Sequence, residues 1–152
     1  MKKIISLALA ALLSAAMFAG CSSSSKMKDG KYRAEYSEPD SHGWTEYVEV
    51  TVSGEKITDV DFDAVNTEGV KKSEDASYDE AMKNAGWTIG PKDFYADLEK
   101  QLIDKQNAND IDGVATATTS SNSLKTLMTE LQKNIAKGDT ATVKVAQPES
   151  SK

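Results

Sequence analysis

A run of small and hydroxyl-bearing residues between Asp112 and Lys125 has the residue types and spacing best suited to chemistry. Its sequence is DGVATATTSSNSLK, and it leads directly into a segment with helical spacing. The first turn of a helix has unpaired backbone N–H groups and the positive end of the helix dipole, so it can bind a phosphate. Hydroxyl groups also cap helix starts, and composition alone favours this capping role, with Ser121 or Asn122 as the cap.

The order of residues in this run resembles the flavinylation motif of FMN-binding domains, which is Asp, two residues, a small residue, Gly, Ala and Thr. Asp112, Ala115, Ala117 and Thr118 occupy matching positions. In that family a flavin transferase joins FMN to the threonine through a phosphoester. The resemblance therefore implies covalent FMN on Thr118, recognition through Asp112 and Ala117, and a further cofactor-binding candidate in Ser121 just beyond the motif.

One motif position departs from the family pattern, because Thr116 stands where glycine is usual. Glycine permits a positive φ or a close backbone approach, and a β-branched residue tolerates neither well. Two alternatives to covalent attachment follow from this difference. One is a domain that binds FMN without a covalent bond, and the other is a non-redox binding or structural lipoprotein that retains the fold.

The resemblance covers roughly residues 28–138. Its other elements are Asp29–Tyr32, His42–Trp44, Ile57–Val60, Lys71–Asp75 and the leucine-patterned last helix. Together these look most like surface lipoproteins that Gram-positive bacteria use in extracellular electron transfer. FMN-carrying subunits of Rnf-type and sodium-pumping quinone reductase complexes contain similar domains.

A flavin ring needs flat apolar cover and polar groups at its edge. Trp44 and Trp87 are candidates for the cover, although either suits the core equally well. His42 is a weaker candidate for the ring edge, since a turn histidine is more often a surface residue. Lys71 and Lys72 are candidates for the phosphate, or simply a solvated charge run. With one histidine and one cysteine, the sequence predicts no metal site and no nucleophilic enzyme.

The first residues have the layout of a lipoprotein signal peptide. Two lysines precede an uncharged apolar run from Ile4 to Phe18, and Phe18–Cys21 resembles a lipobox. We expect residues 1–20 to be removed, residues 21–27 to form a lipidated serine-rich tether, and Cys21 to hold the chain on the extracytoplasmic face of the cell membrane. The alternatives are an unmodified Cys21 at the end of a cleaved signal, and further processing of the signal into a secreted peptide.

The remaining chain predicts one α+β domain. Period-two alternation predicts strands, and helical spacing predicts helices in the second half. The expected strands are Gly30–Tyr36, Tyr47–Val52 and Ile57–Ala64; the expected helices are Glu74–Asn84, one that begins near Pro91, and Leu124–Ile135 with Gly138 just past its end. We expect an antiparallel sheet packed with the helices, with Asp59, Asp61 and Asp63 facing outward. Residues 139–152 form a polar tail with a possible short edge strand.

These features favour an electron carrier rather than an independent enzyme. The formal net charge is −6, and loss of Lys2 and Lys3 would make it more negative, so nucleic acid is not an expected partner. The resemblance implies a flavin transferase, a quinol-linked dehydrogenase in the membrane as electron donor, and an external electron acceptor.

Overall fold

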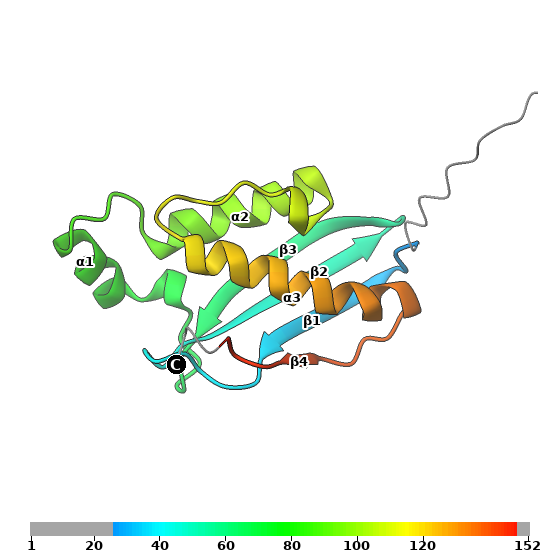
Figure 1. Cartoon of the computed structure of the whole chain (residues 1–152), viewed down its shortest axis with the longest axis horizontal. Helices are drawn as coiled ribbons and strands as arrows, with labels where there is room; N and C mark the ends of the chain where they lie inside the picture. Colours follow the sequence, from blue (N-terminus) through cyan, green and yellow to red (C-terminus); the bar gives the residue numbers. More distant parts are fainter. Residues whose placement is uncertain (1–25, 149–152) are drawn as a thin grey trace, which may run out of the picture.

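The computed structural model describes residues 26–148. The predicted signal peptide, Cys21 and the serine run that follows it lie outside the described residues. Within the described part, no helix is both long enough and apolar enough to span a bilayer. One sheet is covered on one face by two long helices, α2 and α3, and the short helix α1 lies beyond the end of the sheet (Figure 1). The predicted α+β class is therefore confirmed.

The sheet has four strands in the order β3-β2-β1-β4. Their bounds are β1 Gly30–Tyr36, β2 Thr45–Ser53, β3 Lys56–Val65 and β4 Val143–Val145. The first three pair antiparallel as expected, and β4 adds parallel to β1, which makes the sheet mixed. Between β2 and β3, Gly54 and Glu55 both have φ near +60°, as the tight two-residue hairpin turn requires.

The helices follow the sheet in the chain. They are α1 Ala76–Asn84, α2 Pro91–Lys105 and α3 Thr118–Lys137, with short 3-10 turns η1 Lys72–Glu74 and η2 Ala108–Asp110. The first begins later than predicted because the Asp75 carboxylate accepts hydrogen bonds from the backbone nitrogens of Ser77 and Tyr78 and caps it. The last begins earlier than predicted. Its N-cap is Ala117, so the expected capping role of Ser121 or Asn122 was wrong.

The core lies between the sheet and the helices α2 and α3. The predicted apolar stripes are buried: Phe94, Leu98 and Leu102 on α2, and Leu124, Leu127, Met128, Leu131 and Ile135 on α3. Their partners from the sheet include Tyr32, Val48, Val50 and Phe62. These contacts hold α3 firmly, so the start of this helix is a fixed point from which a site can be built.

One side chain of β3 differs from the expected alternation. Asp63 was predicted to face solvent, but it is only 4% exposed. Its carboxylate accepts hydrogen bonds from the Ser73 hydroxyl (2.5 Å) and from the backbone nitrogens of Ser73 (3.2 Å) and Ala64 (2.7 Å). The segment that follows β3 thus folds back over Asp63 and buries it, which strand periodicity alone does not reveal.

Candidate cofactor site

A cavity of about 380 Å³ lies at the N-terminal end of α3. Its volume is within the range of ordinary small-molecule sites, roughly 300–1,000 Å³. The residues that line it come from the turn before β2, β2 itself, η1, α1, the α1–α2 connection, α2 and the motif run: His42, Glu46, Lys72, Tyr78, Met82, Trp87, Phe94 and residues 115–120. The fold therefore brings together five of the sequence-predicted candidates: Thr118, Ala117, Trp87, His42 and Lys72.

Thr118 is the first residue of α3 and is exposed at the cavity. The residue before it, Ala117, occupies the N-cap position and has no side chain that could cap the helix. The backbone N–H groups of the first turn are thus left for a ligand, and the helix dipole favours a negative one. A hydroxyl group and a phosphate-binding helix start therefore lie at the same point.

Ser121 supports this arrangement from behind. Its side chain is buried, accepts a hydrogen bond from the Val114 backbone nitrogen (3.1 Å) and donates one to the Ala117 carbonyl oxygen (2.8 Å). Both bonds join the first turn of α3 to the motif loop before it. We therefore assign Ser121 to positioning of the loop, since it is not among the residues that line the cavity.

Thr116 is compatible with the backbone of this loop. Among the described residues, Glu55 and Gln106 are the non-glycine residues with positive φ, so the position of Thr116 requires no glycine-specific conformation. Thr116 lines the cavity, and its hydroxyl oxygen Oγ1 is buried without a hydrogen-bond partner within the described chain. Buried hydroxyl groups normally have a partner, so this atom is suited to a ligand hydrogen bond.

Glu46 joins three elements at the cavity. Its carboxylate accepts hydrogen bonds from the Ser120 hydroxyl on α3 (2.6 Å) and from the Tyr95 hydroxyl on α2 (3.2 Å). Burial, together with the nearby charge of Glu46, raises the pKa of Tyr95 well above its usual value, so its hydroxyl stays protonated and donates. The sequence analysis missed Glu46 because Ser120 and Tyr95 lie far from it in the chain.

The two tryptophans have different positions. Trp87 is 44% exposed and lines the cavity, so it can cover a flat ring. Trp44 is 6% exposed, belongs to the core cluster and meets the ring of Tyr78 edge to face, with centroids 5.7 Å apart. Trp44 therefore supports the cavity wall through Tyr78, and Trp87 is the tryptophan available to a ligand.

The two candidate lysines also separate. Lys71 pairs with Asp61 at 2.9 Å and is not among the lining residues. Lys72 lines the cavity and is only 8% exposed, with its ammonium group 4.6 Å from the ring centroid of Tyr78. Lys71, at the N-cap of η1, and Lys72, its first residue, thus have side chains in different places, and Lys72 is the lysine at the cavity.

The remaining motif residue, Asp112, lies outside the cavity. Its side chain is 87% exposed and pairs with Lys105 at 2.7 Å. The hydrogen bond from Lys105 lowers the pKa of the Asp112 carboxyl, so this residue is a charged, accessible group at neutral pH. Such a position suits recognition by another protein better than contact with a cofactor.

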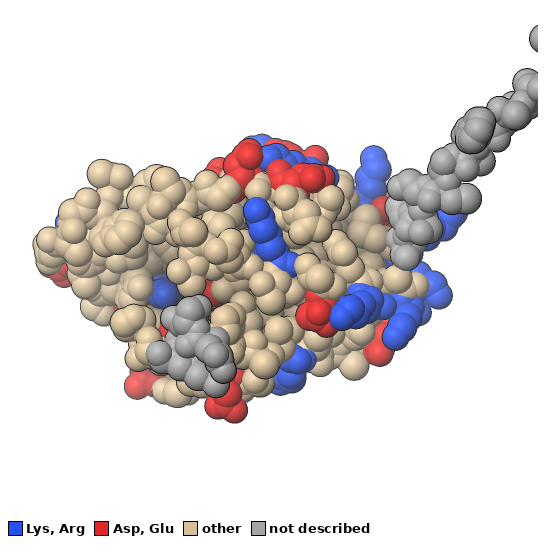
Figure 2. All heavy atoms as spheres, viewed as in Figure 1, with Lys and Arg blue, Asp and Glu red and all other residues tan. Residues whose placement is uncertain are grey.

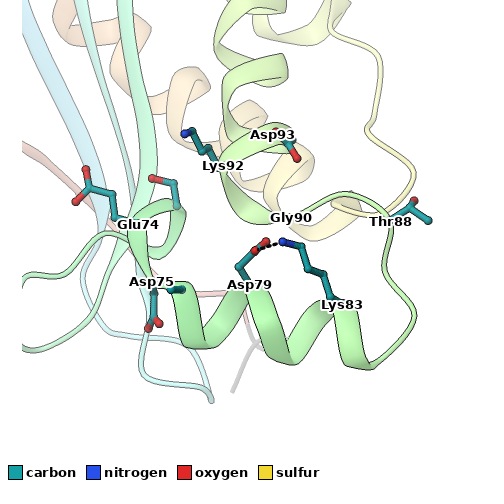
Figure 3. Close-up of a pocket in the computed structure, with 10 residues that line it drawn as sticks. Glu74, Asp75, Asp79, Lys83, Thr88, Gly90, Lys92 and Asp93 are labelled. Atoms are coloured by element: carbon teal, nitrogen blue, oxygen red, sulfur yellow. Dashed lines mark hydrogen bonds and ion pairs between the residues drawn. The ribbon is translucent and has the colours of Figure 1, made fainter.

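A second cavity, of about 680 Å³, lies between α1 and the start of α2 (Figure 3). Charged side chains dominate its walls, including the Asp79–Lys83 ion pair, with Lys92 and Asp93 on α2. Gly90 allows the start of α2 to approach Asp79 on α1 closely, because a Cβ at this position would lie only 2.1 Å from Asp79 Oδ1. None of the described residues that line this space is aromatic, so it does not suit a flat ring.

The charged side chains are unevenly distributed on the face that Figure 2 shows. They gather over α2 and near the end of the molecule where the described chain begins, whereas the surface over α1 and the start of α3 is largely uncharged.

Comparisons with known proteins identify the family of the chain. A family model described as the FMN-binding domain matches residues 42–133, and the chain belongs to this family. Its cofactor is accordingly FMN. The chain is also 37% identical over 129 residues to the 15 kDa lipoprotein of Treponema pallidum, which covers 85% of this chain and 90% of that protein. A crystal structure of the protein CPE2226 from Clostridium perfringens superposes with a TM-score of 0.75 at 36% identity, over 80% of this chain and 99% of that one.

The residues at the cavity fit FMN. The uncapped start of α3 suits its phosphate, Trp87 suits its ring, Lys72 supplies a positive charge in the same cavity, and the unpartnered Thr116 hydroxyl suits a further polar contact.

Proposed function

We propose that the protein is a membrane-anchored, extracytoplasmic flavoprotein that carries FMN covalently on Thr118 and transfers electrons. The electrons would come from a quinol-linked dehydrogenase in the membrane and pass to an acceptor outside. The observation that supports this proposal best is the position of Thr118, whose hydroxyl lies at the uncapped start of α3 and in a cavity of suitable size.

The attachment is a transfer of FMN from FAD by a flavin transferase. Thr118 Oγ1 would form a bond to the phosphorus of the FMN half, the pyrophosphate bond of FAD would break, and AMP would leave while the hydroxyl proton is released. The separate enzyme would supply the base that accepts this proton. Asp112, exposed and charged, is the residue of this chain suited to transferase recognition.

Bound FMN would supply the redox chemistry, and the chain would hold and surround it. The N–H groups of the first turn of α3 would bind the phosphate, and Trp87 would cover the ring. Ser121 would keep the loop before Thr118 in place through its bonds to Val114 and Ala117. A covalent link also prevents loss of the cofactor by dilution outside the cell.

The described chain begins far from Thr118. Near the start of the described chain, the Lys28 backbone nitrogen donates a hydrogen bond to the carbonyl oxygen of Ile135, close to the C-terminal end of α3 (3.2 Å). Thr118 is at the other end of the same helix, roughly 25 Å away at about 1.5 Å per residue (Figure 1). The described chain therefore begins near the end of α3 opposite to Thr118, and a lipid on Cys21 would tether the domain from that side. The lipoprotein relative in Treponema supports such an anchor.

The acidic balance of the chain bears on its partners. With a formal net charge of −6, the protein would attract cationic acceptors and repel anionic ones at low ionic strength. We therefore expect a cationic or neutral electron acceptor.

The decisive experiment is flavinylation of the exported mature domain. The domain is produced together with a flavin transferase and FAD, denatured on a gel, and examined for ultraviolet fluorescence and an FMN-sized mass gain. A fluorescent band is expected for the wild type. A dark band of unmodified mass would contradict covalent attachment, and absorption spectra of the native protein would then show whether FMN binds without a bond.

The matched controls are neighbouring threonines. Thr118→Val is expected to abolish the fluorescence, whereas Thr119→Val keeps it, although both residues line the cavity. Fluorescence that survives Thr118→Val would move the attachment site elsewhere. Anchoring is tested separately, since Cys21→Ala in the full chain is expected to release the protein from the membrane fraction.

A further inference from the structure

We propose that Lys72 is the fixed counter-charge of the cofactor cavity and that it raises the reduction potential of the bound flavin. This inference rests on the proposed function, in which FMN occupies the cavity. The supporting observations are the burial of Lys72, its lack of an ion-pair partner within residues 26–148, and its position at the cavity.

The environment of Lys72 is unusual for a lysine. The residue is only 8% exposed, and lysines are almost never buried this far without a partner. Within residues 26–148, no carboxylate oxygen lies within 4.0 Å of its ammonium nitrogen Nζ. Its neighbours are aromatic, since Nζ lies 5.4 Å from the ring centroid of Trp44 and 4.6 Å from that of Tyr78. Such contacts offset part of the cost of burial and leave the charge without a counter-ion.

Among the described residues that line the cavity, Glu46 is the one with a carboxylate, and it is not paired with Lys72. Ser120 and Tyr95 donate to it at 2.6 and 3.2 Å. The other charge effect at the cavity is the positive end of the α3 dipole, at Thr118. Lys72 and α3 thus both favour a negative ligand in the same space.

The backbone on either side of Lys72 is anchored to β3. Lys71 pairs with Asp61, and the Ser73 hydroxyl donates to Asp63. Because both neighbours are anchored to the sheet, Lys72 cannot easily withdraw its charge from the cavity. Its position is therefore part of the fold and does not depend on a ligand.

A fixed positive charge has a direct redox consequence. Reduction of a flavin by two electrons with uptake of one proton leaves one negative charge on its ring, whereas uptake of two protons leaves the ring neutral. Lys72 favours the charged product and so raises the potential. One charge acting over several ångströms in a protein is expected to change the ratio of reduced to oxidised flavin roughly tenfold at a set potential. For a two-electron couple this equals a shift of ~30 mV.

The test measures the midpoint potential of the flavinylated mature domain by titration with dithionite in the presence of reference dyes. Lys72→Met keeps the approximate length of the side chain and removes its charge. At a set potential we expect its ratio of reduced to oxidised flavin to be roughly tenfold lower than in the wild type, which is a midpoint potential ~30 mV lower. Lys72→Arg should keep the wild-type potential. Lys71→Met is the matched control, because the adjacent lysine lies outside the cavity, and it should leave the potential unchanged. An unchanged potential in Lys72→Met with flavin bound overturns the inference.

A second measurement needs no cofactor. Because the unpaired charge is costly to bury, flavin-free Lys72→Met should require at least as much urea to unfold as the wild type. A merely structural role in stacking on Trp44 and Tyr78 predicts the opposite, a clear loss of stability with no change in potential, and that pair of results also overturns the inference. Lys72→Gln serves the same two tests if the methionine variant does not fold. A wild-type domain that takes up no flavin at all would instead contradict the proposed function, so the two failures are distinguishable.

Discussion

The side-chain oxygen of Ser121 lies 3.1 Å from the backbone nitrogen of Val114, from which it accepts a hydrogen bond. The same hydroxyl donates to the Ala117 carbonyl oxygen, one helical turn earlier. Together the two bonds close the motif loop against the start of α3, immediately beside Thr118. The loop geometry at the attachment site therefore depends on a residue that does not touch the cavity.

We expect Ser121→Ala to weaken both the fold and the loading of FMN. The change leaves the Val114 N–H without its acceptor, which should cost about 1 kcal/mol in the free energy of unfolding. Initial rates of flavinylation should fall because Thr118 is held less firmly. Urea unfolding and the growth of gel fluorescence measure the two effects.

Asn122→Ala is the control for this prediction. Asn122 is the next residue of the same helix and is exposed, so its replacement gives a similar gain in helix propensity without loss of the loop bonds. Equal stability and equal loading rates in the two variants would show that the Ser121 bonds do not organise the site.

Trp87→Ala should reduce FMN affinity with little effect on stability. The side chain is 44% exposed, so the core loses little when it is removed, whereas a ring stacked on it would lose an aromatic contact. Loss of such a contact should raise the dissociation constant for FMN by about three- to tenfold. The measurement is a titration of FMN fluorescence with purified domain in a Thr118→Val background, which prevents covalent capture.

Val70→Ala is the matched comparison, because Val70 is a second large apolar residue that is exposed, at 38%, and does not line the cavity. Its affinity for FMN should equal that of the parent. If both variants bind alike, the ring does not stack on Trp87.

Much of this architecture could be predicted because local sequence patterns determine it. Period-two alternation located β1 to β3, and the stripe from Leu124 to Ile135 located the buried face of α3. The cavity could be predicted only in part. The motif drew attention to Thr118 through resemblance, but the approach of Glu46 and Lys72 depends on tertiary packing between segments that are distant in the chain. No periodicity reports such proximity.

The start of α3 shows why capping rules misplaced one boundary. Side-chain capping predicts a start near Ser121, yet the helix begins at Thr118 with alanine as its N-cap. Ser121 instead bonds the loop from within the first turns, so its hydroxyl contributes to loop geometry and the helix start is left uncapped. A departure from the capping preference thus coincides with the site where an anion is expected.

The pH dependence of stability should reveal the burial of Asp63. Burial raises the pKa of its carboxyl above the usual value, against the opposing effect of the hydrogen bonds from Ser73 and Ala64. The folded state therefore holds the proton more tightly than the unfolded state. This contribution to stability is present below the unfolded pKa and is lost as the pH rises through the folded pKa.

Asp63→Asn removes that titration and keeps the shape of the side chain. Its amide oxygen can accept from the backbone nitrogens, and its amide nitrogen can donate to the Ser73 hydroxyl. We expect the variant to match the wild type at low pH and to gain relative stability as the pH rises from about 4 toward neutral. Urea unfolding at several pH values tests this, and a variant that instead loses relative stability with rising pH would refute the assignment. Asp59→Asn, at an exposed position of the same strand, is the control.

Thr116→Val should separate the two roles of the threonine that replaces the family's usual glycine. The hydroxyl oxygen is buried without a partner in the described chain, so its replacement by a methyl group should raise the stability of the flavin-free protein by about 1 kcal/mol. The same change should weaken FMN binding about tenfold, since a hydrogen bond to the charged cofactor is lost. Thr116→Gly should retain covalent loading, because glycine can adopt the backbone conformation of this position and is the family's usual residue there. Thr119→Val, an exposed neighbour, is expected to change neither stability nor affinity by a comparable amount. Unfolding curves and FMN titrations together decide the matter: a loss of stability in Thr116→Val would mean that the hydroxyl has a partner within the protein and is not kept for the cofactor.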